Sequence, residues 1–379
     1  MGAGRKVKLL FWFSCFLIVL AYAGYPIWLY FRAQFAPRPV RRGSIRPRIT
    51  ILVVVHNEQK YLRGKLQNLA DLEYPADRVE VIVVSDGSTD QTNNILAAWK
   101  NVDRRIIILT NHFGKAAALN RGVAEAKGEI IVFTDARQFI AADGLKYLLE
   151  NFADPSVGCA SGELMIERDR DSSFSEGVGL YWQLEKKIRN WESLAGSVVG
   201  ATGAFYAARK SLLSPLPQDT ILDDVYIPLQ VARQGQRVVF EPKARAWDHF
   251  KPSPKQDFRR KVRTLAGNYQ LLQLAPWLLT RSNPLRLQFF CHKLLRLFVP
   301  FALIGLLTST ICLRTDVYKL ALELQLIFYS LAALSMFRTK AAIISRLSDI
   351  SLAFVILNTA AAVAFLYFVA GRKVVWTRP

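Results

Sequence analysis

Residues 128–137, Gly-Glu-Ile-Ile-Val-Phe-Thr-Asp-Ala-Arg, decide the fold of this chain. The apolar run 130–133, placed between polar neighbours, predicts a buried strand, and Asp135 follows that strand. In an open α/β sheet, ligands bind beyond the carboxyl ends of the strands. A carboxylate at that edge can hold a divalent metal ion, and the metal ion can hold a diphosphate. The end of this strand is therefore the first place to expect a functional site.

The same arrangement occurs upstream, where residues 81–90 read Val-Ile-Val-Val-Ser-Asp-Gly-Ser-Thr-Asp and Asp86 follows the apolar run. Two expected strands thus deliver an aspartate to the same sheet edge. The expected strands cover residues 49–55, 80–84, 105–109 and 130–133, and the expected helices cover 60–72, 91–100 and 116–126. This alternation predicts an α/β fold with a mostly parallel, Rossmann-like sheet and right-handed crossovers. The absence of a Gly-x-Gly-x-x-Gly pattern after residue 84 disfavours a nicotinamide dinucleotide.

The second half of the polar region has a less regular pattern. The expected strands cover residues 158–166, 198–207, 237–240 and 244–247, and the expected helices cover 174–194 and 223–234. A further helix at 257–273 carries an apolar stripe that includes Val262 and Tyr269, with basic residues mostly off the stripe. A basic amphipathic helix before an apolar segment favours a position in the plane of a membrane interface, and an ordinary surface helix is the alternative.

Four apolar segments, 9–31, 289–313, 317–337 and 350–370, have about the 20 residues that a bilayer span needs. They divide the chain into an N-terminal anchor with a basic linker (1–47), a polar domain (48–250), a basic amphipathic region (251–288) and a C-terminal membrane domain of about three helices (289–379). The first apolar segment resembles a cleavable signal peptide, but it continues to Phe31, which favours a retained anchor.

The formal net charge of +20 is concentrated beside the apolar segments. Nine Lys or Arg and no acid precede Glu58, and residues 251–300 hold ten basic residues and one acid. This distribution favours contact with anionic membrane lipids over binding of nucleic acid. The positive-inside rule places the polar domain in the cytoplasm and the N-terminus outside. The membrane is expected to be the inner or plasma membrane of the cell. Three further spans would put the C-terminus outside, whereas Arg372 and Lys373 favour the inside, so a re-entrant segment or a further, unrecognised one is the alternative.

The four cysteines show no metal-site or disulfide spacing, which is typical of a reducing compartment. Other side chains are better candidates for chemistry. Asp86 can accept hydrogen bonds from a ribose or a base, or it can cap the next helix as a turn residue. Asp135 can bind Mg²⁺ or Mn²⁺ together with substrate phosphates, and His249 is a possible second ligand. Asp223 and Asp224 either favour a helix N-terminus or crowd one another, so that one of them can deprotonate a hydroxyl.

Five short motifs, taken in order, resemble those of the membrane-integrated family 2 glycosyltransferases. This family includes the hyaluronan, chitin-oligosaccharide, poly-N-acetylglucosamine and cellulose synthases. The motifs lie at residues 55–58 (Val-His-Asn-Glu), 85–90 (Ser-Asp-Gly-Ser-Thr-Asp), 114–120 (Gly-Lys-Ala-Ala-Ala-Leu-Asn), 135–137 (Asp-Ala-Arg) and 222–224 (Leu-Asp-Asp). The resemblance covers about residues 48–273. It implies an A-type glycosyltransferase fold that is attached to transmembrane helices.

The resemblance also implies the reaction and the roles of the motif residues. A sugar would pass from a nucleotide-diphosphate donor, with uridine favoured, to the hydroxyl of a glycan or lipid-linked acceptor, with inversion at the anomeric carbon. Asp224 would be the general base, with Asp223 beside it, and Asp135 would bind Mg²⁺ or Mn²⁺. The remaining residues would bind the donor: Asn57, Glu58 and Asp86 the nucleoside, and Lys115 the diphosphate.

Two departures from the family pattern matter. Arg137 replaces the second aspartate of the family's Asp-x-Asp motif, which weakens metal binding or lets a guanidinium contact the diphosphate. The Gln-x-x-Arg-Trp motif of processive members matches residues 260–264, where Arg260 comes first, Arg263 is retained and Thr264 replaces the tryptophan. Arg263 could neutralise the leaving diphosphate and Arg260 could assist in binding. Synthesis of a long polymer is in doubt.

The sequence and the resemblance together predict a membrane-bound hexosyltransferase in cell-surface or extracellular glycan synthesis. A non-catalytic, nucleotide-sugar-binding subunit of a synthase complex is the alternative, and Arg137 motivates it. A transporter with a cytoplasmic domain is disfavoured because the four apolar segments show no internal pairing. The sequence leaves open the sugar, the acceptor, processivity, product translocation and the oligomeric state.

Overall fold

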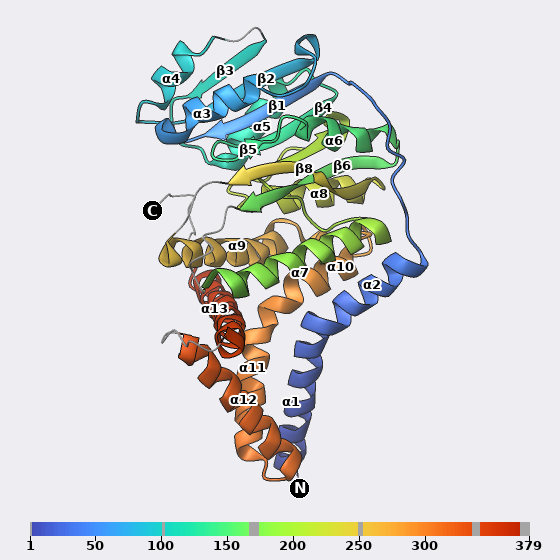
Figure 1. Ribbon diagram of the computed structural model, residues 1–379, viewed down its shortest axis with the longest axis vertical. Coiled ribbons are helices and arrows are strands. Elements are labelled where there is room, and N and C mark those ends of the chain that lie inside the picture. The colour runs from blue at the N-terminus through green and yellow to red at the C-terminus, as the bar shows by residue number, and fades with distance from the viewer. Residues whose placement is uncertain (1, 101–102, 167–173, 249–252, 336–341, 372–379) are drawn as a thin grey trace.

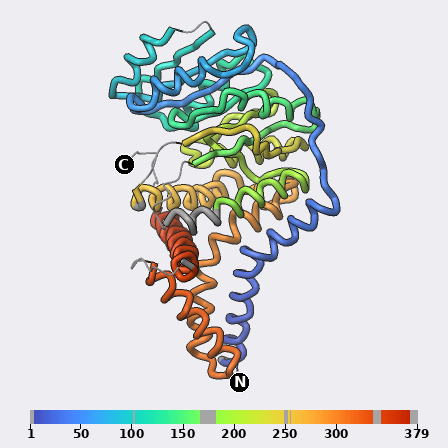
Figure 2. The backbone as a smooth tube through the Cα atoms, in the orientation of Figure 1, coloured from blue at the N-terminus to red at the C-terminus, as the bar shows by residue number. Residues whose placement is uncertain are grey.

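The structure is a computed structural model and describes residues 2–100, 103–166, 174–248, 253–335 and 342–371. Figure 1 shows three levels: a sheet with its helices, two helices that lie below the sheet (α7, Phe174–Ala195, and α9, Pro254–Leu274), and a bundle of apolar helices. The extended linker from the first apolar helices runs along one edge of the molecule to the sheet (Figure 2). The predicted acidic residues and Lys115 lie in the sheet unit, and the predicted Arg260 and Arg263 lie on α9.

Within the described residues, eight strands form one sheet in the order β3-β2-β1-β4-β7-β6-β8-β5. The strands are β1 Ile49–Val55, β2 Val79–Asp86, β3 Arg104–Leu109, β4 Ile130–Asp135, β5 Phe139–Ile140, β6 Val157–Ile166, β7 Phe205–Arg209 and β8 Arg237–Asp248. Strands β1 to β4 are parallel, β7 is antiparallel to both its neighbours, and β8 is parallel to β6. The mostly parallel α/β sheet predicted from the sequence is confirmed.

Helices cover both faces of the sheet, so its central strands are buried on both sides. Alternate residues of β1 enter two separate cores: Ile51 and Val53 face one, and Leu52 and Val54 face the other. The helices of this unit are α3 Gln59–Ala70, α4 Thr92–Ala98, α5 Lys115–Glu125, α6 Gly144–Glu150 and α8 Asp223–Arg233. Short 3₁₀ helices lie at Ala76–Arg78, Asn151–Ala153, Lys210–Leu212 and Pro276–Leu279.

The predictions are accurate in the first half of this unit and weaker in the second. The predicted strand at 49–55 coincides with β1. The predicted strand at 198–207 is wrong for most of its length, because β7 begins at Phe205 and residues 198–204 form no strand. The two short strands predicted at 237–247 are one strand, β8, whose pairing with β6 shifts register beside Ser161. The short elements β5 and α6 were not predicted.

The apolar bundle is built from helices that begin or end near the predicted segments. They are α1 Gly2–Val19, the π-helix η1 Leu20–Gly24, α2 Tyr25–Phe35, α10 Arg286–Phe289, the π-helix η6 Phe290–Leu294, α11 Leu295–Cys312, α12 Asp316–Leu334 and α13 Ala342–Val369. Among the described residues, four continuous helices are long and apolar enough to cross a membrane: Gly4–Phe35, Arg286–Cys312, Asp316–Leu334 and Ile343–Val369. The expected membrane helices are therefore present.

Helix α9 joins the two units. Its predicted apolar stripe is buried in the protein, with Val262 4% and Tyr269 6% exposed. The Tyr269 ring lies 5.9 Å from the ring of Phe365 and 5.2 Å from that of Phe368, at the C-terminal end of α13. In Figure 1, α13 is strongly foreshortened, whereas α1 and α11 extend along the bundle. The end of α13 thus packs on the helix that adjoins the sheet unit.

Candidate active site

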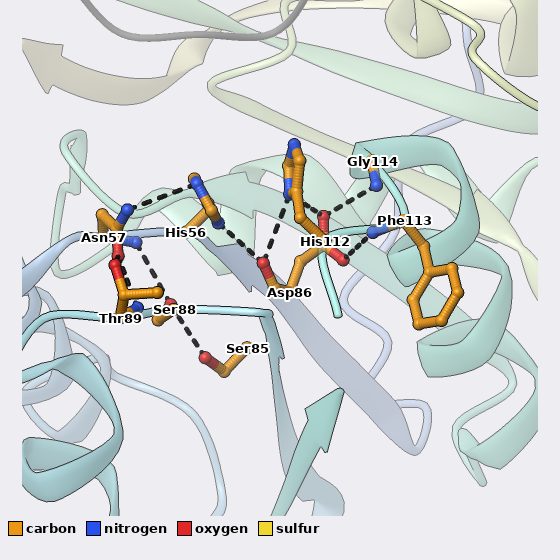
Figure 3. Close-up of polar contacts among 9 residues, drawn as sticks. All are labelled: His56, Asn57, Ser85, Asp86, Ser88, Thr89, His112, Phe113 and Gly114. Atoms are coloured by element: carbon orange, nitrogen blue, oxygen red, sulfur yellow. Dashed lines mark hydrogen bonds and ion pairs between the residues drawn. The ribbon is translucent and has the colours of Figure 1, made fainter. Parts of the chain in front are cut away.

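The carboxyl end of β2 holds a fully buried carboxylate, that of Asp86 (Figure 3). Its Oδ1 accepts from the backbone N–H of Phe113 at 2.8 Å, and its Oδ2 accepts from that of Gly114 at 2.9 Å. The Nδ1 of His112 lies 2.8 Å from Oδ2, and the ring of His56 lies 4.1 Å from the ring of His112. Asp86 therefore fixes the loop before α5, rather than capping the helix α4 that follows it.

The β1 end is organised by Asn57, whose φ of 55° lies in the left-handed region. Its Oδ1 accepts from the backbone N–H of Thr89 at 2.8 Å and of Asp90 at 3.3 Å, so the amide side chain holds the β2–α4 loop (Figure 3). Glu58 is 5% exposed, and its backbone N–H donates to Oγ1 of Thr92 at 2.8 Å. The predicted nucleoside residues therefore form the frame of the loops at this edge.

Lys115 opens α5 immediately after Gly114 and links this frame to the acidic residues. Its Nζ lies 3.1 Å from Oδ1 of Asp135 and 3.3 Å from Oδ1 of Asp223. Burial would lower the pKa of Lys115, but the carboxylates of Asp135, Asp223 and Asp224 outweigh it and hold that pKa above its ordinary value. Residues from three separate segments of the sequence, 115, 135 and 223–224, thus meet around one ammonium.

Asp223 and Asp224 have different surroundings although they are adjacent. Asp223 is 5% exposed, and burial raises its pKa to about 6, with Lys115 opposing the rise and Asp224 and Asp135 adding to it. Asp224 is half-buried, and its Oδ2 accepts from the backbone N–H of Gly203 at 3.2 Å. Asp224 is therefore the more accessible of the two acids for an incoming group.

The irregular segment 199–204 forms the support of Asp224. The backbone N–H of Ala201 donates to the carbonyl oxygen of Asp224 at 2.7 Å, in addition to the Gly203 contact with the side chain. A Cβ added at Gly203 would lie 3.1 Å from Oδ2 of Asp224, so a side chain would disturb the carboxylate. The glycine punctuation that suggested a strand is explained by this close approach to α8.

Sequence reasoning missed Lys65, which lies beneath the end of β4. Its Nζ, fully buried, donates to Oγ1 of Thr134 at 2.8 Å and to the carbonyl oxygen of Gln138 at 2.6 Å. Burial lowers the pKa of Lys65 to about 7, against the attraction of Asp135. Its position in the apolar stripe of α3, adjacent to Leu66, was the signal that could have identified a buried cation.

Tyr206 was also missed. Its side chain is fully buried on β7, its ring stacks on that of Phe133 at 4.6 Å, and no described residue forms a hydrogen bond with its hydroxyl. Burial, followed by the negative charges of Asp223, Asp224 and Asp135 in its surroundings, raises the pKa of Tyr206 well above its ordinary value. The phenol therefore stays protonated, as an unused donor beside the acidic cluster.

The two arginines predicted on α9 have different positions. Arg260 donates to Oδ1 of Asp257 on its own helix at 3.0 Å. Arg263 lies one helical turn before Gly267, whose added Cβ would meet Cγ of Leu222 at 2.6 Å. Since residues four apart share a helix face, Arg263 lies on the face of α9 that packs beside the start of α8. Arg263 therefore lies on the same helix face as Gly267, which packs against Leu222, the residue before Asp223.

The fit of a divalent metal depends on Asp135. Its side chain is 42% exposed, and Arg137 lies two residues later, beyond the end of β4. His249, the other predicted ligand, lies outside the described residues. In the described part of the chain, no group of three or more His, Cys, Asp or Glu is arranged to hold a metal ion. Mg²⁺ can be bound by a single protein carboxylate when substrate phosphate oxygens and water supply the other ligands. Asp135 therefore fits a metal ion only together with a bound diphosphate.

A family model described as "Glycosyl transferase family 2" matches residues 50–216, which include β1 without its first residue, β2 to β7 and four of the five motifs. The chain contains a family 2 glycosyltransferase domain. The poly-beta-1,6-N-acetyl-D-glucosamine synthase of Staphylococcus aureus (strain COL) is 29% identical over 230 residues, which are 59% of this chain and 55% of that protein. The enzyme of that name from Staphylococcus epidermidis is 28% identical over 63% of this chain and 59% of that protein.

The chain spans little more than half the length of the curated relatives it matches. A solved mannosyltransferase from Pyrobaculum calidifontis, in complex with GDP-Man and Mn²⁺, has a TM-score of 0.71 and 23% identity, and the match covers 96% of this chain and 99% of that one. The match therefore extends over the apolar bundle as well as the sheet. The predicted family and the A-type glycosyltransferase fold with membrane helices are confirmed.

Proposed function

We propose that this chain is a membrane-bound, inverting glycosyltransferase that moves a sugar from a nucleotide-diphosphate donor to an acceptor hydroxyl. The observation that carries the proposal is the convergence of Lys115, Asp135, Asp223 and Asp224 at the carboxyl edge of the sheet. In such a site the cation can stabilise the departing diphosphate. The accessible carboxylate can accept the proton of the attacking hydroxyl.

In the proposed reaction, Asp224 accepts the proton of the acceptor hydroxyl. The acceptor oxygen forms a bond to the anomeric carbon from the face opposite the diphosphate, while the bond from that carbon to the diphosphate oxygen breaks. The configuration at the carbon is inverted. Lys115, Arg137 and Arg263 neutralise the charge that develops on the diphosphate. The contact of Gly203 with Oδ2 of Asp224 orients the carboxylate.

On the donor side, the proposed nucleoside site lies beyond the ends of β1 and β2. Both oxygens of Asp86 already accept backbone N–H groups, so its proposed role is to set the 112–114 loop and the position of Lys115. Asn57 and Glu58 hold the adjacent turn at the same edge. The name of the curated relatives makes N-acetyl-D-glucosamine the first sugar to test, with uridine diphosphate as the proposed carrier.

We further propose that Mg²⁺ or Mn²⁺ binds at Asp135 together with donor phosphate oxygens. Such an ion would supply positive charge for the departing diphosphate. Because Arg137 stands where a second carboxylate would be, the protein's own affinity for the ion should be weak. Titration of Mn²⁺ into the protein, without and with the nucleoside diphosphate, tests this, and the expected result is measurable binding only with the nucleotide.

The proposed location is the plasma or inner membrane, with the sheet unit in the cytoplasm where activated sugars are made. Six arginines between Arg32 and Arg48 flank the first membrane helix on the sheet side, which supports this orientation. The proposed acceptor is a glycan or a lipid-linked glycan that reaches Asp224.

The test uses the full chain in lipid nanodiscs, a panel of uridine- and guanosine-linked sugars, and mass analysis of the products. Asp224→Asn should lower turnover by about 10²–10⁴-fold while nucleotide binding is kept, because only the proton acceptor is lost. Asp71→Asn, an exposed change immediately after the end of α3, is the control. Wild-type turnover in Asp224→Asn would refute the base assignment. Intact binding without turnover in the wild type would favour a non-catalytic subunit.

A further inference from the structure

The orientation of Asp224 depends on a segment that has no sheet pairing of its own. Residues 199–204 precede β7 and form no strand or helix, yet two of their backbone N–H groups contact Asp224. An irregular segment keeps its shape only where side chains or backbone from elsewhere hold its polar groups. The groups that hold this segment therefore also control the carboxylate of Asp224.

Helix α7 holds the segment at two points. Arg189 donates from its guanidinium to Oγ1 of Thr202 at 2.5 Å, and Oε2 of Glu192 accepts from the backbone N–H of Val199 at 3.4 Å. Arg189 and Glu192 are three residues apart, so they lie on the same face of the helix. From the opposite side, Ser161 on β6 accepts from the backbone N–H of Thr202 at 2.9 Å.

The same face of α7 is anchored in the apolar bundle. The other oxygen of Glu192, Oε1, accepts from the hydroxyl of Tyr25 on α2 at 2.6 Å and lies 2.8 Å from Nδ1 of His292 on η6. The second ring nitrogen of His292 lies 2.5 Å from Oε1 of Glu185, whose Oε2 accepts from Arg296 at 2.9 Å. One carboxylate oxygen of Glu192 thus contacts the membrane helices, and the other accepts a hydrogen bond from the segment that supports Asp224.

Burial makes this anchor stiff. Glu192 is 1%, His292 2% and Glu185 8% exposed. Charge pairs in such surroundings resist rearrangement, because removing one partner leaves the other charge buried without compensation. His292 also lies in a π-helical turn, a feature that is often found at functional sites. The cluster therefore fixes α7 against the spans and, through α7, the segment 199–204.

We propose that Arg189 and Glu192 are positioning residues that tie the support of the general base to the membrane helices. This inference rests on the proposed role of Asp224. It makes the apolar bundle part of the catalytic apparatus and not only an anchor. The donor half of the site, from β1 to β4, has its own contacts and should not respond to a change on α7.

The central variant is Arg189→Met in the full chain, in nanodiscs, compared with Arg189→Lys and Thr202→Val. Lys187→Met, an exposed change of the same charge on the same helix, is the control. We expect Arg189→Met to lower kcat by about 10–100-fold, with the KM of the donor and the Kd of the nucleoside diphosphate changed less than twofold. Arg189→Lys should restore part of the rate, and the double variant Arg189→Met/Thr202→Val should lose no more than either single one.

Backbone hydrogen exchange supplies a measurement that does not depend on activity. Exchange in residues 199–204 should become at least about tenfold faster in Arg189→Met, while the peptide that contains α5 keeps its wild-type rate. Unchanged exchange in 199–204, or an equal loss of donor binding and of kcat, would overturn the positioning role even if the wild type is active. A wild type without turnover on any donor would refute the proposed function, and the exchange result would still decide whether α7 holds the segment.

Discussion

The two polar clusters at the carboxyl edge of the sheet differ in how completely their groups are paired. Around Asp86, both carboxylate oxygens accept backbone N–H groups, and a histidine ring adds a third partner. Around Lys115, several carboxylates share one ammonium, the pKa of Asp223 is raised to about 6, and the hydroxyl of Tyr206 has no hydrogen-bond partner among the described residues. A completed cluster stabilises the fold, whereas an incomplete one keeps groups available for a substrate.

The cluster around Asp86 positions a residue of the cluster around Lys115. Asp86 holds the backbone of Gly114, and Lys115 is the next residue. A loop fixed by a buried carboxylate delivers the ammonium to a defined place at the start of α5, so that less ordering is needed when a diphosphate binds. Changes in the first cluster should therefore act mainly on stability, and changes in the second mainly on turnover.

The largest effect should come from breaking the completed cluster with Asp86→Ala. Two backbone N–H groups and the ring of His112 lose a buried charged acceptor, which should lower the free energy of unfolding by about 3–5 kcal/mol. Asp86→Asn keeps one acceptor oxygen and should lose clearly less. Thermal unfolding in detergent measures both. If both variants melt like the wild type, Asp86 is not the residue that holds this loop.

The next largest effect should come from Lys115→Met in the incomplete cluster. Loss of the charge that faces the diphosphate should reduce kcat/KM by about 10²–10³-fold, about 3–4 kcal/mol of transition-state stabilisation. Lys127→Met, a change of the same type at an exposed lysine two residues after the end of α5, is the control. Product formation under steady-state conditions measures the effect, and a loss of less than fivefold would exclude Lys115 as the main diphosphate contact.

A smaller effect should appear in the pH dependence of stability. Because the pKa of Asp223 is raised from 3.8 to about 6 by folding, the folded protein holds this proton more tightly than the unfolded chain does. The destabilisation is absent below about pH 4, grows up to about pH 6 and is complete above it, with an upper limit of about 3 kcal/mol at 1.36 kcal/mol per pKa unit.

Asp223→Asn removes this titration. Relative to the wild type, the variant should gain stability as the pH rises from 4.5 to 7.5, and melting curves of the two proteins over that range measure the difference. Parallel curves would mean that Lys115 compensates the carboxylate of Asp223 fully in the folded protein.

Much of the sheet could be predicted from the sequence because parallel strands buried on both faces leave a simple signal. Residues 49–55 are apolar except for Thr50, and their ends match the structure. Residues 198–204 carry small and apolar residues as well, yet they form no strand: Val198 makes a single backbone bond to β8, and the residues after it bond to α8 and to side chains of α7. No local pattern specifies such partners, since they come from distant parts of the chain.

In the candidate site, too, some features had a local sequence signal and others depend on distant parts of the chain. Asp86, Lys115, Asp135 and the pair at 223–224 could be identified because each follows or opens a regular element. Their pairing could not, because it depends on how α5 and α8 converge. Lys65 was detectable in principle as a charge within an apolar helical stripe. Tyr206 gave no such signal, since a tyrosine in a strand is ordinary and only the structure shows that its hydroxyl lacks a partner.

The smallest predicted effect tests whether the Tyr206 hydroxyl, which has no hydrogen-bond partner among the described residues, forms a hydrogen bond only when substrate is bound. Tyr206→Phe should leave the free protein as stable as the wild type or more stable by up to about 1 kcal/mol, because a buried, unsatisfied donor is removed. If a bound diphosphate draws Lys115 away from Asp223, the protonated hydroxyl, whose pKa that carboxylate raises, can donate to it, and its loss should lower kcat about threefold to tenfold without a change in the KM of the donor.

Tyr74→Phe supplies the matched comparison, because the hydroxyl of Tyr74 donates to the carbonyl oxygen of Pro47 at 2.7 Å, remote from the acidic cluster. That variant should lose about 1 kcal/mol of stability and keep its turnover, the reverse of the Tyr206 result. Equal stability losses in the two variants would show that the Tyr206 hydroxyl is paired in the free protein. An unchanged kcat in Tyr206→Phe would show that it stays unused after the donor binds. The same chemical change at a paired and an unpaired hydroxyl thus separates a group that maintains the fold from one that is held for the reaction.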